Sequence, residues 1–413
     1  MHRTLVVLGL CESLVGCSPR RPAAQGSAPR SEVVRPGIDV LLTDSMAVVR
    51  DHRVGLVTNQ AGVDAQGISD VARLHAAGVR LVALFSPEHG FRGAAEPGAA
   101  VASSIDSATG LPIYSLYGRS TAPTDTMLAG IDLLLVDLQD AGARYYTYLF
   151  TTIEVMRAAT ARGIPVVVLD RPDPIGGAVQ GNVLDPAYRT PVGQLAVPMR
   201  YGMTLGELAR LARADLGLAT DLRVVPVAGW RRATPLDATG LPFVPPSPNL
   251  RSLEALYHYP GTCLFEGTNL SVGRGTDAAF MQVGAPWLDT AAVLTRIRGA
   301  RLPGVRFHGV NFTPQAPGDG KYGDTVVVGI RLELTDRERY DPAATAVHLL
   351  AAVRAASGDR FGWIPKHFDR LAGGPALREA LDAGTDPATI VAGWAEALRR
   401  FRERRRTFLL YPE

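Results

Sequence analysis

Polar side chains that can bind a ligand follow several short apolar segments of this chain, at the points where those segments end. Glu88 and His89 come directly after the apolar residues 81–85, and Gln139 comes shortly after residues 133–136. Turn formation explains Gly, Pro, Asn and Asp at such points, but it does not explain glutamate, histidine, glutamine and arginine. The residues that we expect to bind the ligand are Asn59, His89, Arg92, Gln139, Arg144, Tyr145, Asp170, Arg171, Asn249, Asn269 and Arg274.

This set of side chains suits a sugar. Amides, carboxylates and guanidinium groups form hydrogen bonds with hydroxyl and acetamido groups, and an aromatic ring packs on the apolar side of a sugar ring. Cleavage of a glycosidic bond needs a carboxylic acid that protonates the leaving oxygen, with a nucleophile or a base on the other side of the sugar. Glu88 is the candidate for the acid, because it follows a proline at a strand end. The alternative, structural roles for Glu88 are an ion pair with Arg92 and a carboxylate at the start of a helix.

Other chemistries find little support in the sequence. His89, His258 and His308 are not spaced as ligands of one metal ion. Ser86 and Ser247 do not lie in the G-x-S-x-G segment of a serine nucleophile. The first apolar run is followed neither by the glycine triad of dinucleotide-binding proteins nor by a Walker phosphate loop. We therefore expect no metal and no cofactor.

The composition is that of an ordinary globular protein, with 46% hydrophobic and 20% charged residues. The 43 basic side chains are almost balanced by 40 acidic ones, so the chain lacks the basic footprint of a nucleic-acid-binding protein. One local excess of arginine occurs at residues 399–406. We interpret it as the solvated face of a last helix.

Short apolar runs alternate with helical stretches between residues 54 and 175. Continuous apolar strands in this rhythm, with helices such as 70–77 and 151–162, indicate a parallel sheet that is covered on both faces. Right-handed crossovers then give a doubly wound, Rossmann-like α/β lobe, and such lobes bind ligands beyond the carboxyl ends of their strands. The expected strands are residues 54–57, 81–85, 112–116, 133–136 and 166–169.

The rhythm changes near residue 190, where we expect a second, smaller α+β lobe to begin, with the active-site cleft between the two lobes. Thr204 and Glu207 form the capping box of a helix start. The loops at 245–249 and 265–276 are expected to close the cleft, because prolines make the first rigid and glycines let the second approach a ligand. The later elements that we expect are a strand at 325–334 and helices at 341–356 and 387–400. The expected divisions of the chain are a signal peptide at 1–17, a tether at 18–34, a catalytic lobe at 35–190 and a C-terminal lobe at 191–413.

The first residues predict export. A basic start and an apolar run precede Leu14-Val15-Gly16-Cys17, which resembles the lipobox of a bacterial lipoprotein with Cys17 as the lipidated residue. The run is shorter than the roughly 20 apolar residues that cross a bilayer. Residues 18–31 are rich in Pro, Ala, Arg and Ser, as expected of a flexible tether. We expect a membrane-anchored lipoprotein of the cell envelope or periplasm; a plain cleaved signal and a buried cytosolic N-terminus are the alternatives.

Seven short sequence motifs, which are listed at the end of this paragraph, occur in one order along the chain. Together they resemble the exo-acting peptidoglycan β-N-acetylmuramidase family (NamZ-like), long known as a family of unknown function. The resemblance extends from about Gly37 to Tyr411. Asp173 stands where Asn is expected to be common. The segments that carry the resemblance are Thr58-Asn59-Gln60, Ser86-Pro87-Glu88-His89-Gly90-Phe91-Arg92-Gly93, Asp137-Leu138-Gln139-Asp140 with Gly142 and Arg144, Asp170-Arg171-Pro172, Tyr201-Gly202-Met203-Thr204, Pro246-Ser247-Pro248-Asn249, and Glu266-Gly267-Thr268-Asn269 with Gly273-Arg274-Gly275-Thr276.

The resemblance implies a glycosidase that removes β-1,4-linked N-acetylmuramic acid from the non-reducing end of peptidoglycan fragments. It also implies a cleft between a Rossmann-like lobe and a smaller lobe. The glutamate of the Pro-Glu-His-Gly motif is the catalytic residue that the family implies, and here it is Glu88. The second catalytic group stays open between Glu266, Asp140 and the acetamide of the substrate itself.

Muramic acid differs from glucosamine by a lactyl carboxylate, and the candidates to pair with this group are Arg92, Arg144 and Arg274. The expected partners are thus peptidoglycan fragments (muropeptides), together with a membrane that is reached through the lipid anchor alone. We expect no nucleic acid. Two other classes stay open, a non-catalytic lipoprotein that binds cell-wall sugar and a hydrolase of another ester or of a phosphate.

Overall fold

The computed structural model describes residues 1–2, 4–5, 9 and 33–413. The predicted lipobox with Cys17 and almost all of the predicted tether lie outside the described residues. Residues Val33–Glu413 pack together as one unit. None of the helices in the described part of the chain is long and apolar enough to cross a membrane.

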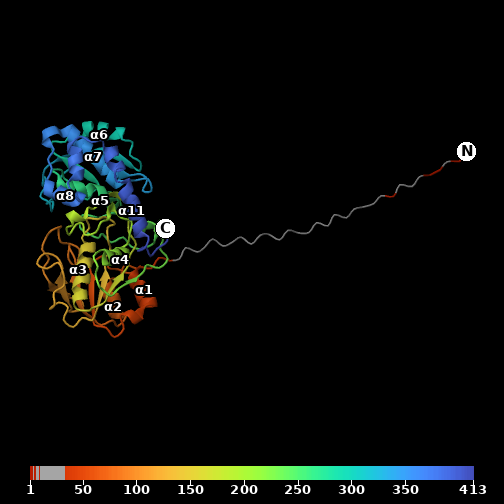
Figure 1. Ribbon diagram of the computed structural model, residues 1–413, viewed down its shortest axis with the longest axis vertical. Helices are drawn as coiled ribbons and strands as arrows, with labels where there is room; N and C mark the ends of the chain where they lie inside the picture. The colour runs from red at the N-terminus through yellow and green to blue at the C-terminus, as the bar shows by residue number, and fades with distance from the viewer. Residues whose placement is uncertain (3, 6–8, 10–32) are drawn as a thin grey trace. The chain divides into compact units, whose positions relative to one another are not determined.

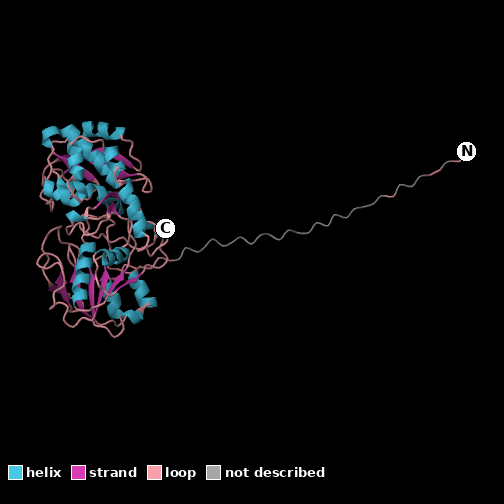
Figure 2. Ribbon diagram, viewed as in Figure 1, coloured by secondary structure: helices cyan, strands magenta, loops and turns pink. Residues whose placement is uncertain are grey.

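A seven-stranded, mostly parallel sheet forms the first lobe (Figures 1 and 2). The strand order is β3-β4-β2-β1-β5-β6-β9, and the short β3, antiparallel to β4, is the exception to the parallel pairing. The parallel strands, counted along the chain, follow the 3-2-1-4-5-6 order of a Rossmann fold, so the predicted fold class is confirmed. The strands are β1 (Val54–Thr58), β2 (Leu81–Ser86), β3 (Ser104–Ile105), β4 (Pro112–Ser115), β5 (Leu133–Asp137), β6 (Val166–Leu169) and β9 (Leu222–Val225).

Helices cover both faces of this sheet, and for that reason its central strands are continuously apolar. Leu133 and Leu135 of β5 belong to one buried cluster with residues of α1 and α2. Leu134 and Val136 of the same strand belong to another cluster with α3 and α4. The covering helices are α1 (Gly37–Asp44), α2 (Asp70–Ala76), α3 (Tyr148–Ala161) and α4 (Leu205–Asp215).

The second lobe contains a three-stranded antiparallel sheet of order β10-β12-β11 and a set of helices. The buried cluster on the α3 side of the first sheet continues into this lobe, where it includes Phe265 and Leu350. The two lobes therefore share one hydrophobic core. The elements are β10 (Gln282–Ala285), β11 (Val305–Phe312), β12 (Val327–Leu334), α5 (Leu253–Thr262), α6 (Thr290–Gly299), α7 (Pro342–Ser357), α8 (Pro365–Ala372), α9 (Ala376–Asp382), α10 (Pro387–Ala392) and α11 (Ala395–Arg405).

The change of rhythm near residue 190 has a local cause. The strands β7 (Gln180–Val183) and β8 (Pro198–Arg200) form an antiparallel hairpin, and β7 packs against α7 and α11 of the second lobe. The chain then returns to the first sheet through α4 and β9, so the first lobe continues past residue 190. The helix expected at 387–400 is two helices, α10 and α11, which are separated at Gly393.

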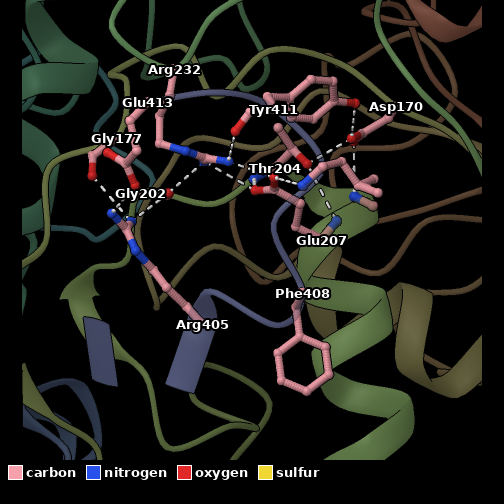
Figure 3. Close-up of polar contacts among 12 residues, drawn as sticks. Asp170, Gly177, Gly202, Thr204, Glu207, Arg232, Arg405, Phe408, Tyr411 and Glu413 are labelled. Carbon is pink, nitrogen blue, oxygen red and sulfur yellow. Dashed lines mark hydrogen bonds and ion pairs between the residues drawn. The ribbon is translucent and has the colours of Figure 1, made fainter. Parts of the chain in front are cut away.

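The last residues of the chain also return to the first lobe (Figure 3). The hydroxyl of Tyr411 donates a hydrogen bond to Asp170 at 2.5 Å and accepts one from the backbone N–H of Val227 at 3.0 Å. The backbone N–H of Leu410 donates to Glu207, which also forms a buried ion pair with Arg232. These contacts attach the end of α11 to the loops beyond β6 and β9.

The arginines at residues 399–406 divide into two groups. Arg399 is exposed and pairs with Glu396, as expected of a solvated helix face. The interpretation is wrong for Arg405, which is 5% exposed. Its guanidinium group donates hydrogen bonds to the carbonyl oxygens of Tyr201 and Gly202 at 3.0 and 2.7 Å. A buried charge of this kind persists because it satisfies carbonyl groups that water does not reach.

Candidate active site

A cavity of about 720 Å³ lies between the loops that follow the strands of the first sheet and the second lobe. Parallel strands end at a common edge, and α/β sheets bind their ligands beyond that edge. The cavity thus lies where the sequence predicts the site. First-lobe residues that line it include Glu88, His89, Tyr117, Tyr145 and Thr147, and second-lobe residues that line it include Glu266, Arg274, Asp319, Lys321, His367 and Arg370.

Glu88 lies in the loop that follows β2 and is 7% exposed. The backbone N–H of Gly98 donates to its Oε1 at 3.0 Å, and the hydroxyl of Thr147 donates to its Oε2 at 2.7 Å. A backbone N–H can only donate, whereas a hydroxyl can donate or accept. Thr147 is therefore able to hydrogen-bond with Glu88 in both its ionised and its protonated form, and a proton carried by Glu88 belongs on Oε2.

Thr147 occupies the N-cap position of α3, yet its side chain forms no capping hydrogen bond. The side chains of Thr204 and Ser252, by contrast, do cap α4 and α5. A capping side chain stabilises a helix by about 0.5–2 kcal/mol. The hydroxyl of Thr147 instead binds Glu88. The helix α3 therefore lacks the stabilisation of a capping side chain, and the hydroxyl orients a cavity residue.

The turn after Glu88 is strained. His89 has a φ of 71°, a left-handed conformation that residues other than glycine rarely adopt. Its Nδ1 donates to the carbonyl oxygen of Ala95 at 2.8 Å, which fixes the ring. Burial lowers the pKa of His89, so the ring is neutral and Nε2 is an acceptor. Gly93 closes the turn so near to Gln60 that a Cβ atom would lie 2.0 Å from Cδ of that side chain.

Tyrosines pack around Glu88. Burial and the negative charge of Glu88 raise the pKa of Tyr117 to about 12, so this hydroxyl keeps its proton. The rings of Tyr146 and Tyr148 lie 4.5 Å apart between centroids. Both of their hydroxyls donate to the carbonyl oxygen of Pro246, at 2.7 and 2.9 Å. These bonds attach the proline-rich loop at 245–249 to the start of α3.

An ion pair lines the second-lobe side of the cavity. Nε and Nη2 of Arg274 lie 2.7 and 2.6 Å from Oε1 of Glu266, in the 3₁₀ turn Cys263–Gly267. Burial alone would raise the pKa of Glu266, but the charge and hydrogen bonds of Arg274 outweigh it and lower that pKa. Glu266 is thus a carboxylate at neutral pH. The guanidinium group of Arg274 also lies 5.0 Å from the ring centroid of Phe280.

Lys321 supports the same turn from the loop between β11 and β12. Its Nζ donates to the carbonyl oxygens of Glu266 and Leu270, both at 3.0 Å. Burial lowers the pKa of Lys321. The chain has 43 basic side chains, and all except Lys321 and Lys366 are arginines. This rarity is a signal that sequence reasoning missed.

Two predicted site residues that follow β5 lie outside the cavity. Arg144 is 3% exposed, and its guanidinium group donates to the carbonyl oxygens of Asn182 at 2.8 Å and Leu371 at 3.0 Å. Asp140 accepts hydrogen bonds from the backbone N–H of Gly142 and from the hydroxyl of Tyr201. Burial raises the pKa of Asp140 to about 6. Arg144 therefore joins segments of the two lobes. Asp140 fixes the buried side chain of Tyr201.

Asp170 and Arg171 also take part in buried contacts away from the cavity. Asp170 accepts hydrogen bonds from the hydroxyls of Thr204 and Tyr411. Arg171 forms a bidentate ion pair with Asp137, at 2.5 and 2.9 Å. These residues hold the carboxyl ends of β5 and β6 in place.

The predicted amide side chains serve mainly to fix loops. Gln139 donates to the carbonyl oxygen of Pro172 at 3.1 Å. Asn59 donates to the hydroxyl of Tyr148 at 2.6 Å, so it supports the cavity indirectly. Asn249 donates to Glu96 at 3.4 Å, and Asn269 donates to the carbonyl oxygen of Arg360 at 2.8 Å.

Arg92 is exposed and lines a different cavity of about 550 Å³, together with His75 and Asp106. The structure therefore brings Glu88, His89, Tyr145, Glu266 and Arg274 to one cavity and places the other predicted residues around it. No group of three His, Cys, Asp or Glu side chains suited to a metal ion occurs among the described residues.

Sequence reasoning did not find Thr147, Tyr117, Asp319 or His367 as cavity residues. Thr147 precedes a helix, where a threonine is ordinarily a cap, and Tyr117 follows a weak apolar run. Asp319 and His367 reach the cavity from the 313–326 loop and from α8, and no local pattern relates these segments to Glu88.

Comparison with known proteins shows a consistent similarity. The family model for the N-terminal part of the exo-β-N-acetylmuramidase NamZ matches residues 54–254, and that for its C-terminal part matches residues 257–411. The peptidoglycan β-N-acetylmuramidase NamZ of Bacillus subtilis (strain 168) is 39% identical over 393 residues, which cover 94% of each chain. Two crystal structures of DUF1343 family proteins from Bacteroides fragilis NCTC 9343 are also similar. The first has a TM-score of 0.84 and 32% sequence identity, and the match covers 93% of this chain and 100% of that protein's chain. The second has a TM-score of 0.76 and 31% sequence identity, and the match covers 92% of this chain and 99% of that protein's chain.

Proposed function

The chain belongs to the exo-β-N-acetylmuramidase family NamZ, and from this membership we infer that it is a glycosidase of peptidoglycan. Its reaction is the hydrolysis of the β-1,4 bond of a non-reducing-end N-acetylmuramic acid. The products are free N-acetylmuramic acid and a shortened fragment. Both halves of the chain match the family.

The observation that carries the mechanism is the setting of Glu88. Its carboxyl group lines the cavity, and Gly98 and Thr147 fix both of its oxygen atoms. We propose that Glu88 is the general acid, which gives the proton on Oε2 to the glycosidic oxygen as the bond breaks. Thr147 can donate to Oε2 both before and after the proton leaves, so the carboxyl group stays in position throughout the reaction.

The cavity also has the aromatic and polar surfaces that a sugar requires. Tyr117 keeps its hydroxyl proton, so it can donate to a sugar oxygen. The neutral ring of His89 offers an acceptor at Nε2. Phe150 and Tyr145 supply apolar surface for the ring face.

The direct test of this function is the release of N-acetylmuramic acid from the disaccharide in which it is β-1,4-linked to N-acetylglucosamine. Chromatography should show the free sugar accumulating in proportion to enzyme and time. The competing proposal, a lipoprotein that binds cell-wall sugar without turnover, predicts that the disaccharide is bound and recovered intact.

We propose in addition that the enzyme is exported and held at the membrane by a lipid on Cys17. The support is the lipobox-like sequence and the Pro- and Ala-rich segment that follows it. Cys17→Ala should accumulate as unprocessed precursor, whereas Cys11→Ala should be processed normally. Recovery of the wild-type protein in the soluble fraction with Met1 still present would contradict the anchor.

A further inference from the structure

Arg274 has a donor group that the protein does not use. The residue is 7% exposed and lines the cavity. Its Nε and Nη2 face Glu266, but its Nη1 is buried and has no hydrogen-bond partner among the described residues. An unpaired buried donor on a charged group has lost its hydration without gaining a hydrogen bond. Because Arg274 lines the cavity, a bound ligand can supply the missing acceptor.

The charges of the cavity indicate which kind of acceptor that is. Three cations of the second lobe line it, Arg274, Lys321 and Arg370, against the two carboxylates of Glu266 and Asp319. The second-lobe side of the cavity therefore keeps a positive charge after its ion pair is counted. The first-lobe residues that line the cavity include no lysine or arginine.

Arg274 lines the same cavity as Glu88, on its second-lobe side. Its positive charge acts on His89, the residue next to Glu88, as one of the influences that lower the pKa of that ring. In muramic acid the glycosidic oxygen leaves from C1, and the lactyl group is attached at O3. One ring can thus present its scissile bond to Glu88 and its lactyl carboxylate to the second-lobe side.

We propose that Nη1 of Arg274 binds the lactyl carboxylate of the substrate and so selects muramic acid over glucosamine. The proposal rests on the proposed function. It also assigns Glu266 as a positioning residue, which holds the guanidinium group through Nε and Nη2 and leaves Nη1 without a protein partner among the described residues. Arg144 and Arg92 have no part in this contact, because one is bound to carbonyl oxygens and the other lines a separate cavity.

The test compares two substrates on each protein. They are the 4-nitrophenyl β-N-acetylmuramide and its lactyl carboxamide, which has nearly the same shape and no charge. Wild-type enzyme should show a kcat/KM about ten- to a hundredfold higher for the free acid, the usual worth of a charge-assisted hydrogen bond. Arg274→Gln should reduce this ratio to near one, mainly through KM for the acid. Arg274→Lys should keep part of it. Partial unfolding affects both substrates equally, so the ratio reports recognition alone.

Two variants separate this role from a structural one. Arg144→Lys alters another buried arginine and should lower the melting temperature without changing the ratio. Glu266→Gln should lower the ratio, and Glu266→Asp should restore part of it. A wild-type ratio near one, or an unchanged ratio in an active Arg274→Gln variant, would overturn the inference. If the wild type cleaves neither substrate nor the natural disaccharide, the proposed function fails, and the inference fails with it.

Discussion

Asp173 stands where we expect Asn to be common in the family, and its surroundings show how the carboxyl group is accommodated. The side chain is 2% exposed, and its Oδ2 has no hydrogen-bond partner among the described residues. Gly142 makes room for it, since a Cβ atom there would lie 2.6 Å from Oδ1. Burial raises the pKa of Asp173 from its usual 3.8 to about 7, although Arg200 opposes the rise.

We therefore predict that Asp173→Asn stabilises the protein more at high pH than at low pH. A carboxyl whose folded-state pKa is raised contributes stability below about pH 4 and loses it as the pH rises through about 7. An asparagine has no such dependence. The stability difference should grow between pH 4.5 and 8 by about 3 kcal/mol, since roughly 2.5 pH units of this range lie below the folded-state pKa and each is worth about 1.36 kcal/mol.

Urea denaturation at several pH values measures this difference. Asp277→Asn is the matched control, because the side chain of Asp277 is fully exposed, and it should show no such trend. An Asp173→Asn variant whose advantage is the same at pH 4.5 and pH 8 would show that Asp173 is ionised throughout.

Helix α3 shows how an element can be built for a site at the expense of its own stability. Its N-cap residue Thr147 donates to Glu88, whereas Ser69, the N-cap of α2, accepts from the backbone N–H of Ala72 at 3.2 Å. Two residues in equivalent positions thus have different roles. Only a structure distinguishes them, because Ser and Thr are both ordinary caps in a sequence.

Substitutions at the two N-cap residues, Thr147 and Ser69, should have separate effects on activity and on stability. Thr147→Val removes the bond to Glu88 and should lower kcat/KM about tenfold, while the melting temperature hardly changes. Thr147→Ser keeps a hydroxyl and should restore most of the activity. Ser69→Ala should instead cost about 0.5–2 kcal/mol of stability and leave kcat/KM unchanged. Loss of stability without loss of activity in Thr147→Val would assign this hydroxyl to its helix.

The elements that sequence patterns predict well are those whose two faces are both buried. The apolar runs at 54–57, 81–85, 133–136 and 166–169 correspond to β1, β2, β5 and β6. β9 is half-exposed and reads Leu-Arg-Val-Val, so it lacks the continuous apolar character of an internal strand. The β7–β8 hairpin interrupts the alternation of strands and helices, so the sequence pattern did not predict that the chain returns to the first sheet at β9.

The site was predictable where a loop points directly into the cavity, as at Glu88 and Arg274. The position of a side chain was not predictable where the conformation of the loop determines the direction in which the side chain points. Arg144 follows β5 as expected, but it turns to the carbonyl oxygens of Asn182 and Leu371. Lys321 reaches the cavity from a segment more than 200 residues after Glu88, and that approach depends on the packing of the whole second lobe.

In the whole molecule, the chain end holds the two lobes in one arrangement (Figure 3). Tyr411 binds Asp170 and Val227, and Arg405 binds the carbonyl oxygens that precede α4. These contacts add to the buried cluster that extends through both lobes.

Tyr411→Phe should lower the stability of the whole protein. It leaves the buried N–H of Val227 without its acceptor, which costs roughly 1–3 kcal/mol. The melting temperature should fall by a few degrees, and the kcat/KM at 25 °C should stay within about twofold. Tyr188→Phe, at an exposed position, should change neither quantity. A large loss of activity at an unchanged melting temperature would mean that the chain end acts on the cavity directly.

The measurement that tests the central claim most directly is the turnover of the natural disaccharide by Glu88→Gln. Glutamine keeps the hydrogen bonds to Gly98 and Thr147 but has no acidic proton, and general acid–base groups contribute roughly two to four decades of rate. Release of N-acetylmuramic acid should therefore fall at least a hundredfold at an unchanged melting temperature. A substrate with an activated leaving group, which needs less protonation, should lose less. Near-normal turnover of the disaccharide by a folded Glu88→Gln variant would contradict the account.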